Sequence, residues 1–599
     1  MRALAVACVL VSACGGNNGG DDTFDFDHVE VEPAFAAVTV ELGKTASQPY
    51  IIYGVNGTKK QDITARCGLA LDSTFGTFAG ATATIFARGG KTTVDATCGA
   101  LAGQGVLTVN LVGDVVVGPN TPPNAADIFD GATGGTDASR SPTIEYPIDR
   151  AVSPRNIPSI EFQWTRAGND LFHVALRSSF AEVDVYTTEL EALMTTVDWE
   201  SLIGSVAGEN LAITVEGLAQ AAASTKFASA LTTLVVTNDT LDRTAIYYWA
   251  SSQEKILSQT FGDPTPPSLV KDQCTSCHSV SRNGARIGYS RCIGGDCNQL
   301  YAGFMKYDPL TKTWVESYDA NTKTIQGSYT TFAPVGNPFP DGDQALAMVG
   351  MANGTLALYD PDTGAPVASN LAVASPAGRS AMMPDWSADG NKVVFASTPT
   401  ANQWIDLDGG RIATMSYSYT GGVHTFGTPT NIVPDPIVLP GGTYQNFFFP
   451  SFSPDGNLVV FNAARSAWRN FNPGGMRSTG ARLMISESSG AWISDLTAMN
   501  GGTSDGGVTW AHWAPTISNE YYWIVFSSER DYGHRTTAAT SAGCIANGVS
   551  QCKQIWLGAI AKTKLGTMMD PSAPPMWLPG QNPLANNISP YWSIPTQLQ

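Results

Sequence analysis

The sequence predicts an all-β protein built from several domains. Charged residues make up only 14% of the 599 residues, whereas glycine (60) and proline (36) are abundant, a balance that favours short strands and many turns over long helices. Alternating apolar and polar runs recur between glycine-rich turns. One strand-and-turn pattern is repeated, because residues 384–395 match residues 450–461. The length exceeds what one core usually supports, and it predicts about three or four domains.

The N-terminus has the features of an export signal. An apolar stretch at residues 3–11 is too short to span a bilayer. It runs into Val11-Ser12-Ala13-Cys14, which resembles the lipobox of bacterial lipoproteins. The resemblance implies a signal peptide at residues 1–13, acylation of Cys14, and a flexible acidic tether at residues 14–28. It places the protein in the cell envelope, lipid-anchored on the periplasmic or extracellular face of the outer membrane; a cleaved signal without lipid is the alternative.

Two strand-rich regions follow the tether. Residues 29–118 alternate apolar and polar residues between glycine-rich turns, which predicts a β-sandwich that looks like a bacterial Ig-like domain. Residues 119–140 are rich in Pro, Gly, Asn and Asp and are predicted to be a linker. Residues 141–263 predict a second sandwich, resembling fibronectin type III domains, with one helix near residues 199–206.

The repeated pattern predicts hairpins. Each copy places an aromatic residue before an Asp-Gly turn and an alternating strand, and glycine suits the positive φ of such a turn. Weaker copies lie at residues 331–334, 512–515 and 590–593, and a sixth lies at residues 277–289. These repeats resemble those of TolB-like, WD40-like β-propellers. The resemblance implies that residues 264–599 form a six-bladed β-propeller, a fold whose central channel commonly accepts ligands.

The sixth copy of the repeat carries a haem-attachment motif. Cys274-Thr275-Ser276-Cys277-His278 supplies two thiols for the vinyl groups of haem and an imidazole for the iron. The motif resembles that of c-type cytochromes and implies one covalent haem c, held by Cys274, Cys277 and His278. For the sixth iron ligand the repeat register favours Met383, which occupies the position of Cys277 in its own blade. His512 is the alternative, and ordinary packing of Met383 is the other reading.

The cysteine count is consistent with an oxidising compartment. With Cys14 lipidated and two cysteines on haem, proximity in the sequence predicts three disulfides, namely Cys67–Cys98, Cys292–Cys297 and Cys544–Cys552. Three alternatives for the motif cysteines remain open. Cys274 and Cys277 could join Cys292 and Cys297 in a zinc site, act as a redox dithiol, or form a surface disulfide.

These features predict an exported cytochrome that carries electrons or senses redox state, with a redox protein or another envelope protein as its partner. The net charge of −18 opposes binding to nucleic acid, and the lipid would provide the membrane contact. A second hypothesis is a TolB-like interaction platform without functional haem. A third is an enzyme that passes electrons from a substrate to the haem, although the sequence contains no recognisable second cofactor motif.

Overall fold

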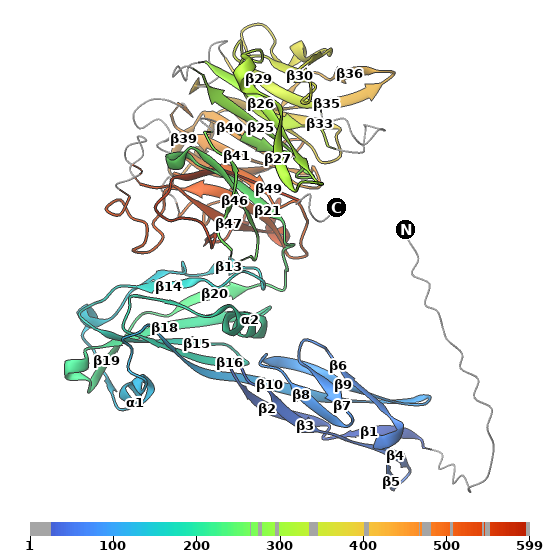
Figure 1. The fold of residues 1–599 in the computed structure, drawn as a ribbon, viewed down its shortest axis with the longest axis vertical. Helices are drawn as coiled ribbons and strands as arrows, with labels where there is room; N and C mark the ends of the chain where they lie inside the picture. Colours follow the sequence, from blue (N-terminus) through green and yellow to red (C-terminus); the bar gives the residue numbers. More distant parts are fainter. Residues whose placement is uncertain are drawn as a thin grey trace. The chain divides into compact units, whose positions relative to one another are not determined.

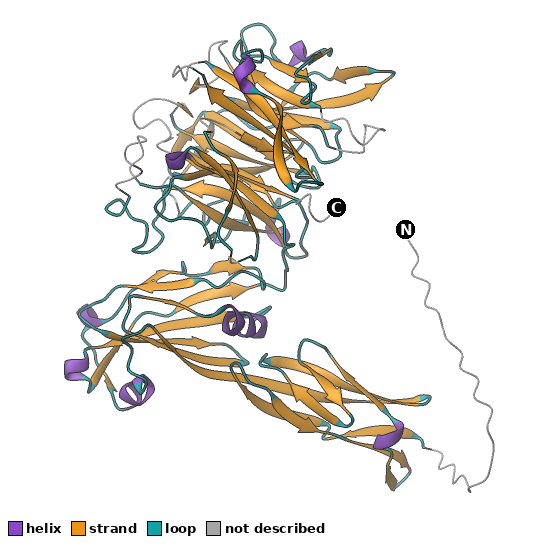
Figure 2. Cartoon of the chain, viewed as in Figure 1, coloured by secondary structure: helices purple, strands orange, loops and turns teal. Residues whose placement is uncertain are grey.

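The chain folds almost entirely into β-sheets. The structure is a computed structural model that describes residues 26–263, 265–273, 278–293, 299–334, 346–399, 406–466, 468–469, 481–502, 507–541, 544 and 551–594. Within these ranges it has many sheets and two α-helices, α1 (Ala125–Asp130) and α2 (Thr196–Ser205) (Figures 1 and 2). The all-β prediction is therefore confirmed. Contacts divide the described chain into a compact unit of residues 26–39, 45–86 and 91–109, and a second unit that comprises the rest.

The first unit consists of short antiparallel strands around apolar side chains such as Ile52, Val94 and Leu107, all fully buried. A disulfide between Cys67 and Cys98 joins two neighbouring strands at their ends. The strands are β1 (His28–Glu32), β2 (Phe35–Glu41), β3 (Ala46–Pro49), β4 (Ile51–Asn56), β5 (Lys59–Asp62), β6 (Gly68–Leu71), β7 (Gly76–Ala79), β8 (Thr82–Ile85), β9 (Gly90–Cys98) and β10 (Leu101–Val117). The end of β10 continues into the second unit, so the first unit ends earlier than the predicted residue 118.

The second unit opens with two sheets. In the larger sheet, β15 lies between β16 and β18, and β16 pairs in parallel with residues 111–117 of β10. The smaller sheet has the order β12-β14-β17. The strands are β11 (Thr133–Gly134), β12 (Ile144–Tyr146), β13 (Ala151–Ser153), β14 (Glu161–Trp164), β15 (Leu171–Arg177), β16 (Ala181–Thr187), β17 (Glu191–Leu193), β18 (Asn210–Leu218), β19 (Thr225–Ala228) and β20 (Thr232–Val236).

The segment predicted to be a linker is partly ordered. Residues 119–140 contain helix α1 and strand β11, which pairs with β19. Ala125 and Phe129 lie one turn apart on α1 and are both buried, so this apolar stripe attaches the helix to the sheet. The helix predicted near residues 199–206 is confirmed as α2, whose Thr195 side chain accepts a hydrogen bond from the amide of Asp198.

Six antiparallel sheets form the rest of the described chain. The pairing orders are β23-β22-β21-β49, β24-β25-β26-β27, β28-β29-β30-β31, β32-β33-β35-β36 with β37 beside β35, β40-β41-β43-β44, and β45-β46-β47-β48. The strands are β21 (Ala245–Ala250), β22 (Lys255–Thr260), β23 (Ser268–Lys271), β24 (His278–Val280), β25 (Arg286–Cys292), β26 (Leu300–Asp308), β27 (Thr313–Tyr318), β28 (Gly327–Phe332), β29 (Ala347–Met351), β30 (Leu356–Tyr359), β31 (Pro366–Val367), β32 (Ser380–Trp386), β33 (Lys392–Thr398), β35 (Arg411–Thr420), β36 (Val423–Phe426), β37 (Thr430–Asn431), β40 (Asn446–Phe452), β41 (Leu458–Ala464), β43 (Ala481–Glu487), β44 (Ile493–Asp495), β45 (Thr509–Trp513), β46 (Tyr521–Ser528), β47 (Gln554–Ala561), β48 (Met576–Trp577) and β49 (Asn587–Ser593). Two small pairs lie between them, β34 (Asp406–Leu407) with β42 (Trp468–Arg469), and β38 (Ile437–Leu439) with β39 (Gly442–Tyr444).

The repeated sequence pattern forms the first hairpin of these sheets. In the turn between β40 and β41, the Ser453 hydroxyl donates to Asp455 over 2.5 Å and accepts from the amide of Leu458 over 3.0 Å, while Gly456 has a φ of 70°. Ser387 with Asp389, and Ser281 with Asn283, make the equivalent side-chain bonds. The hairpins predicted at residues 277–289, 384–395 and 450–461 are therefore confirmed, whereas the copy at residues 590–593 lies in β49, which pairs with β21 and forms no hairpin.

We call β24, β28, β32, β40, β45 and β49, one from each sheet, the first strands of the six sheets. They contact one another in this cyclic order, and β49 contacts β24. The sheet that contains β49 takes its other three strands, β21 to β23, from residues 245–271. This corrects the predicted domain boundary at residue 263, because β21 pairs with β49 and with β22, and neither strand pairs with the sheets that precede them.

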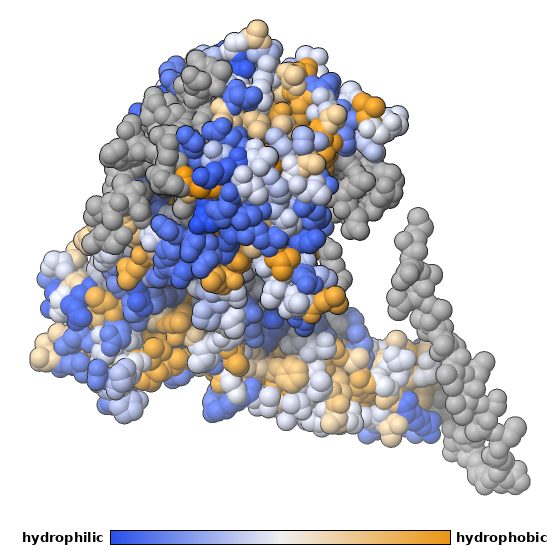
Figure 3. All heavy atoms as spheres, turned by 45° about the horizontal axis from the view of Figure 1, so that its top comes forward, coloured by the Kyte–Doolittle hydropathy of each residue, from blue (hydrophilic) through white to orange (hydrophobic). Residues whose placement is uncertain are grey.

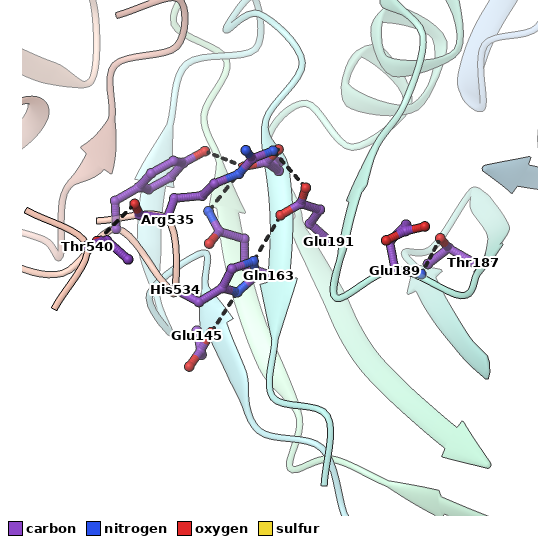
Figure 4. A network of polar contacts seen from close by, with 10 residues as sticks. Glu145, Gln163, Thr187, Glu189, Glu191, His534, Arg535 and Thr540 are labelled. Atoms are coloured by element: carbon purple, nitrogen blue, oxygen red, sulfur yellow. Dashed lines mark hydrogen bonds and ion pairs between the residues drawn. The ribbon is translucent and has the colours of Figure 1, made fainter. Parts of the chain in front are cut away.

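The two sheets that open the second unit share one hydrophobic core with the sheet of β45 to β48. Tyr146 lies 4.9 Å from Tyr532, which stacks on Trp577 at 4.0 Å. Beside this core, His534 contacts Glu145 and Glu191, as Figure 4 shows. On the face in Figure 3, hydrophilic and hydrophobic residues are interspersed.

Candidate functional site

One cavity is lined by residues from the first strand of all six sheets. Its lining includes the three iron-ligand candidates His278 on β24, Met383 on β32 and His512 on β45. The other residues are Tyr329, Thr330, Pro384, Asp385, Phe449, Pro450, Trp510, Ser589 and Tyr591. The structure thus brings together side chains that lie far apart in the sequence. It places them where the repeat register predicted.

A bulge recurs in these first strands and aligns the cavity residues. The pairing register shifts there, and the residue at the shift has a φ of 50–54°, a region that non-glycine residues seldom occupy. These residues are Tyr329, Met383, Phe449, Trp510 and Ser589. The repeat assigns the same position in β24 to Cys277, the residue directly before His278. Cys274 and Cys277 both lie outside the described residues.

His278 is buried, and the backbone of Tyr247 interacts with its ring without forming a hydrogen bond of good geometry. Among the described residues, neither of its ring nitrogens has a hydrogen-bond partner, and its ring lies 5.4 Å from that of Tyr591. Burial lowers the pKa of His278 to about 3. The imidazole is therefore neutral near pH 7 and retains a lone pair, which is the form that coordinates metals.

His512 also lies beside Tyr591 and is buried like His278. Its ring lies 3.7 Å from the Tyr591 ring, and its Nδ1 has no partner within the described part of the chain. Burial, followed by the nearby His278, lowers the pKa of His512 to about 3. Two neutral imidazoles therefore line the same buried space. An unpaired buried polar atom costs about 1–3 kcal/mol, so this arrangement favours a site that a ligand completes.

Met383 supplies a thioether to the cavity. Its side chain is 4% exposed, and its Sδ accepts a hydrogen bond from the amide of Phe449 over 3.4 Å. The neighbouring Met382 packs in the apolar cluster beside the cavity. The sequence could not distinguish a ligand from a packing role for Met383, and its position in the cavity lining is compatible with either.

An ion pair lies at the edge of the cavity. Asp385 lines it and accepts a hydrogen bond from the amide of Phe452 over 2.7 Å, and Arg282 lies 3.4 Å from its carboxylate. Burial raises the pKa of Asp385, and Arg282 opposes that shift. Arg282 also donates to the carbonyl of Trp386 over 2.7 Å, so it ties the hairpin of the haem motif to β32.

The donor atoms suit iron, but the cavity does not hold a porphyrin. Imidazole and thioether are both axial ligands of haem iron in proteins. The space enclosed by the described side chains is about 30 Å³, enough for a water molecule or two. A haem held by His278 would therefore occupy volume outside this cavity, or Tyr591 and its neighbours would have to move.

The remaining predicted site residues fall into three groups. Cys67–Cys98 and Cys544–Cys552 are disulfides, as predicted. Cys292 is also disulfide-bonded, which removes its thiolate from the four-cysteine zinc alternative; its predicted partner Cys297 lies outside the described residues. Cys14, the predicted lipidation site, lies outside them as well.

Several cavity residues were missed by the sequence analysis. Trp510 and Tyr591 were not singled out, although they lie in copies of the repeat that contains Met383. The signal that could have found them is their place in the repeat: Trp510 occupies the bulge position, and Tyr591 lies two residues after the bulge at Ser589.

Among the described helices, none is long and apolar enough to cross a bilayer.

Comparisons with known proteins show no family. No family model matches the chain, and no curated protein matches it. One solved structure, described as an oxidoreductase (glucose dehydrogenase) from Thermus thermophilus, aligns over 33% of this chain and 57% of that one, with 13% identity and a TM-score of 0.19. At that similarity it carries no argument about fold or function.

Proposed function

We propose that the protein is an exported, lipid-anchored c-type cytochrome with one haem, and that it transfers electrons or senses redox state. The observation that carries the proposal is that the Cys-x-x-Cys-His motif ends in a residue of the cavity lining. The Cys-x-x-Cys-His string leads directly into β24, whose first residue, His278, is a buried and unpartnered imidazole. His512 and Met383 line the same cavity from two other strands.

We further propose that residues 245–594 form a six-bladed β-propeller. The cyclic contacts of the six first strands support this arrangement, as does the sheet that combines β49 with β21 to β23. Pairing the last strand with early ones is a way to close a ring of sheets, because it ties the two ends of the chain segment into one sheet. The cavity with His278 would then lie in the central channel.

Each residue of the site has a distinct role in this proposal. Cys274 and Cys277 would hold the haem by thioether bonds and His278 would be its proximal ligand, while the haem supplies a one-electron iron couple. Low pKa values keep His278 and His512 neutral and able to coordinate. The apolar walls of Phe449 and Trp510 exclude water, which raises the strength of electrostatic interactions at the site.

The decisive experiment is expression with export in a host that matures c-type cytochromes. We expect a c-type pyridine-haemochrome spectrum, one haem in the intact mass, and retention of haem after acid-acetone extraction. Cys274→Ala/Cys277→Ala should abolish all three. Cys67→Ala/Cys98→Ala removes the same number of thiols in the other compact unit and should retain haem. A wild-type mass without haem, with Cys274 and Cys277 joined as a disulfide or bound to zinc, would overturn the proposal and favour an interaction platform.

The sixth ligand can be tested on the same preparation. We propose Met383, which requires that Tyr591 and its neighbours move to admit the haem. A thioether ligand raises the reduction potential relative to a second imidazole. Met383→Ala should therefore lower the potential and remove the thioether-to-iron band of the oxidised protein, whereas His512→Ala should leave both unchanged. The reverse outcome would assign His512 as the ligand.

A lipid anchor at Cys14 would place the cytochrome at a membrane of the cell envelope. Labelling with a fatty-acid probe should modify the wild-type protein and not Cys14→Ser, which we expect in the soluble fraction with its haem intact. An unlabelled wild-type protein would contradict the anchor without affecting the haem assignment.

A further inference from the structure

A second, larger cavity lies apart from the histidine site. It measures about 470 Å³, within the range of about 300–1,000 Å³ that is typical of small-molecule sites. One wall is the face of the sheet β21 to β23 that carries Tyr247, and the other is the hairpin of β26 and β27 in the neighbouring sheet. None of the iron-ligand candidates is among the described residues that line it.

Three aromatic rings form the floor of this cavity. Trp314 lies 5.9 Å from Tyr247 at an angle of 88°, and 5.6 Å from Tyr307, its partner across the β26–β27 pair. Tyr247 is buried, whereas Trp314 is only half-buried. The face of an indole ring is negative and attracts the polarised C–H groups of a ligand. The rings meet edge to face at 88° and 69° and form no continuous flat surface, so the half-buried Trp314 is the ring that suits a flat ligand face made of C–H groups.

Hydroxyl groups surround the aromatic floor. Strand pairing puts Ser258 opposite both Tyr247 and Ser268, so these three side chains form one row across β21, β22 and β23. Thr260 and Thr313 also line the cavity. Each hydroxyl can donate and accept a hydrogen bond, as each hydroxyl of a ligand can.

One polar atom beside the cavity lacks a partner. The hydroxyl of Tyr307 is buried and has no hydrogen-bond partner among the described residues. Such a group costs about 1–3 kcal/mol when unpaired. A ligand rich in hydroxyls could satisfy it with a small adjustment of the side chain.

The charges of the lining argue against an ionic ligand. Asp263 and Lys312 are the charged residues among the described ones, and their signs are opposite. A phosphate or carboxylate would find no cluster of positive charge, and the protein as a whole carries −18. The aromatic floor, the hydroxyl row and the balanced charge point together to a neutral, hydroxylated ring compound.

We propose that this cavity, defined by Tyr247, Ser258, Ser268, Tyr307 and Trp314, binds a neutral oligosaccharide, with Trp314 as the stacking platform. Full-length protein should be titrated with maltotriose, cellotriose, xylotriose and chitotriose by saturation-transfer NMR and calorimetry. We expect saturable binding of at least one of them, with enhancement of the C–H protons of a sugar face.

Matched variants keep this test sharp. Trp314→Ala should weaken binding at least tenfold, and Ser268→Ala, an exposed change that leaves the aromatic rings in place, should weaken it several-fold. Trp492→Ala removes another half-buried tryptophan outside the cavity and should bind as the wild type does. Failure of the wild type to bind any probe, or equal affinity of the wild type, Trp314→Ala and Ser268→Ala, would overturn the proposal. The haem spectrum is read separately, so either proposal can fail alone.

Discussion

His173 is held between two carboxylates on the sheet of β15, β16 and β18. Its Nδ1 lies 2.9 Å from Glu216 and its Nε2 lies 2.5 Å from Asp184. Burial alone would lower the pKa of His173, but the hydrogen bonds and charges of Asp184 and Glu216 outweigh burial and raise it. Burial alone would raise the pKa values of Asp184 and Glu216. Their contacts with His173 outweigh burial, so both pKa values are lowered.

Because of this cluster, the stability of the protein should depend on pH in two ranges, one alkaline and one acidic. The raised pKa of His173 means that its contribution is complete below the unfolded value of 6.5 and is lost as pH rises through the folded pKa. The pKa values of both carboxylates are lowered, so the stability that they contribute is lost as pH falls below 4.5 for Glu216 and below 3.8 for Asp184. In thermal melts from pH 5.5 to 9, His173→Gln should flatten the alkaline loss of stability. The exposed His28→Gln should not, and identical profiles for all three proteins would refute the assignment.

Asp239 anchors the turn before β46. Its buried carboxylate accepts hydrogen bonds from the amides of Asn519 over 2.9 Å, Glu520 over 3.1 Å and Tyr521 over 3.0 Å, and from the indole of Trp523 over 3.3 Å. One side chain thus connects the end of the sandwich to a sheet that begins far later in the sequence.

Asp239→Asn keeps the shape of the side chain but turns an acceptor into a donor. Some of the four bonds are then lost and buried N–H groups stay unpaired, so we expect a loss of about 2–3 kcal/mol in the free energy of unfolding. Urea unfolding followed by circular dichroism measures it. The exposed Asp242→Asn is the control and should shift the midpoint little; a similar shift in both variants would contradict the anchoring role.

At the scale of elements, the hairpin of the repeat predicts a graded response to alanine. Gly456 has a φ of 70°, and an added Cβ would meet nothing closer than Ser387 Cβ at 3.7 Å. Gly284 has a φ of 67°, and its Cβ would lie 2.0 Å from the carbonyl oxygen of Ile594. Gly456→Ala should therefore cost about 1 kcal/mol of conformational strain, and Gly284→Ala about 2–4 kcal/mol because backbone must also shift. Equal unfolding midpoints for the two variants would refute this ranking.

The parts of the fold that could be predicted are those encoded locally. Hairpins need a turn and two alternating strands, which one short window contains, and the short-range disulfides Cys67–Cys98 and Cys544–Cys552 follow from proximity. The meeting of His278, Met383 and His512 could be predicted because they occupy nearby positions in copies of one repeat. Because the copies of a repeat form equivalent strands, a local sequence pattern also predicts which distant residues lie near one another.

The parts that could not be predicted depend on contacts distant in the sequence. The residues of β21 read as a strand whether it joins the sheets before it or pairs with β49, so the boundary at residue 263 was placed wrongly. Helix α1 has an apolar stripe of only Ala125 and Phe129, which composition rich in Pro and Gly concealed. The cavity of Tyr247 and Trp314 needs two sheets to be placed side by side.

At the scale of the whole molecule, strand β49 connects the last part of the second unit to the much earlier strand β21. Trp592 on β49 is buried; its indole donates to Thr244 over 2.6 Å, and its ring lies 5.6 Å from that of Phe261. β49 pairs along β21 and also contacts β24 and β45. Loss of this one strand would remove the pairing partner of β21 and the contacts that β49 makes with β24 and β45.

Trp592→Ala should therefore destabilise the protein by more than its local packing. Truncating a buried tryptophan costs about 3–5 kcal/mol, and release of β49 would also expose the edge of β21. We expect a lower and broader urea transition, with early proteolytic cleavage on the C-terminal side of β48 detected by mass spectrometry. Trp492→Ala, a half-buried control on another sheet, should lower the midpoint less and leave the cleavage pattern unchanged. A sharp transition with a wild-type cleavage pattern in Trp592→Ala would mean that the strand packs there without holding the six sheets together.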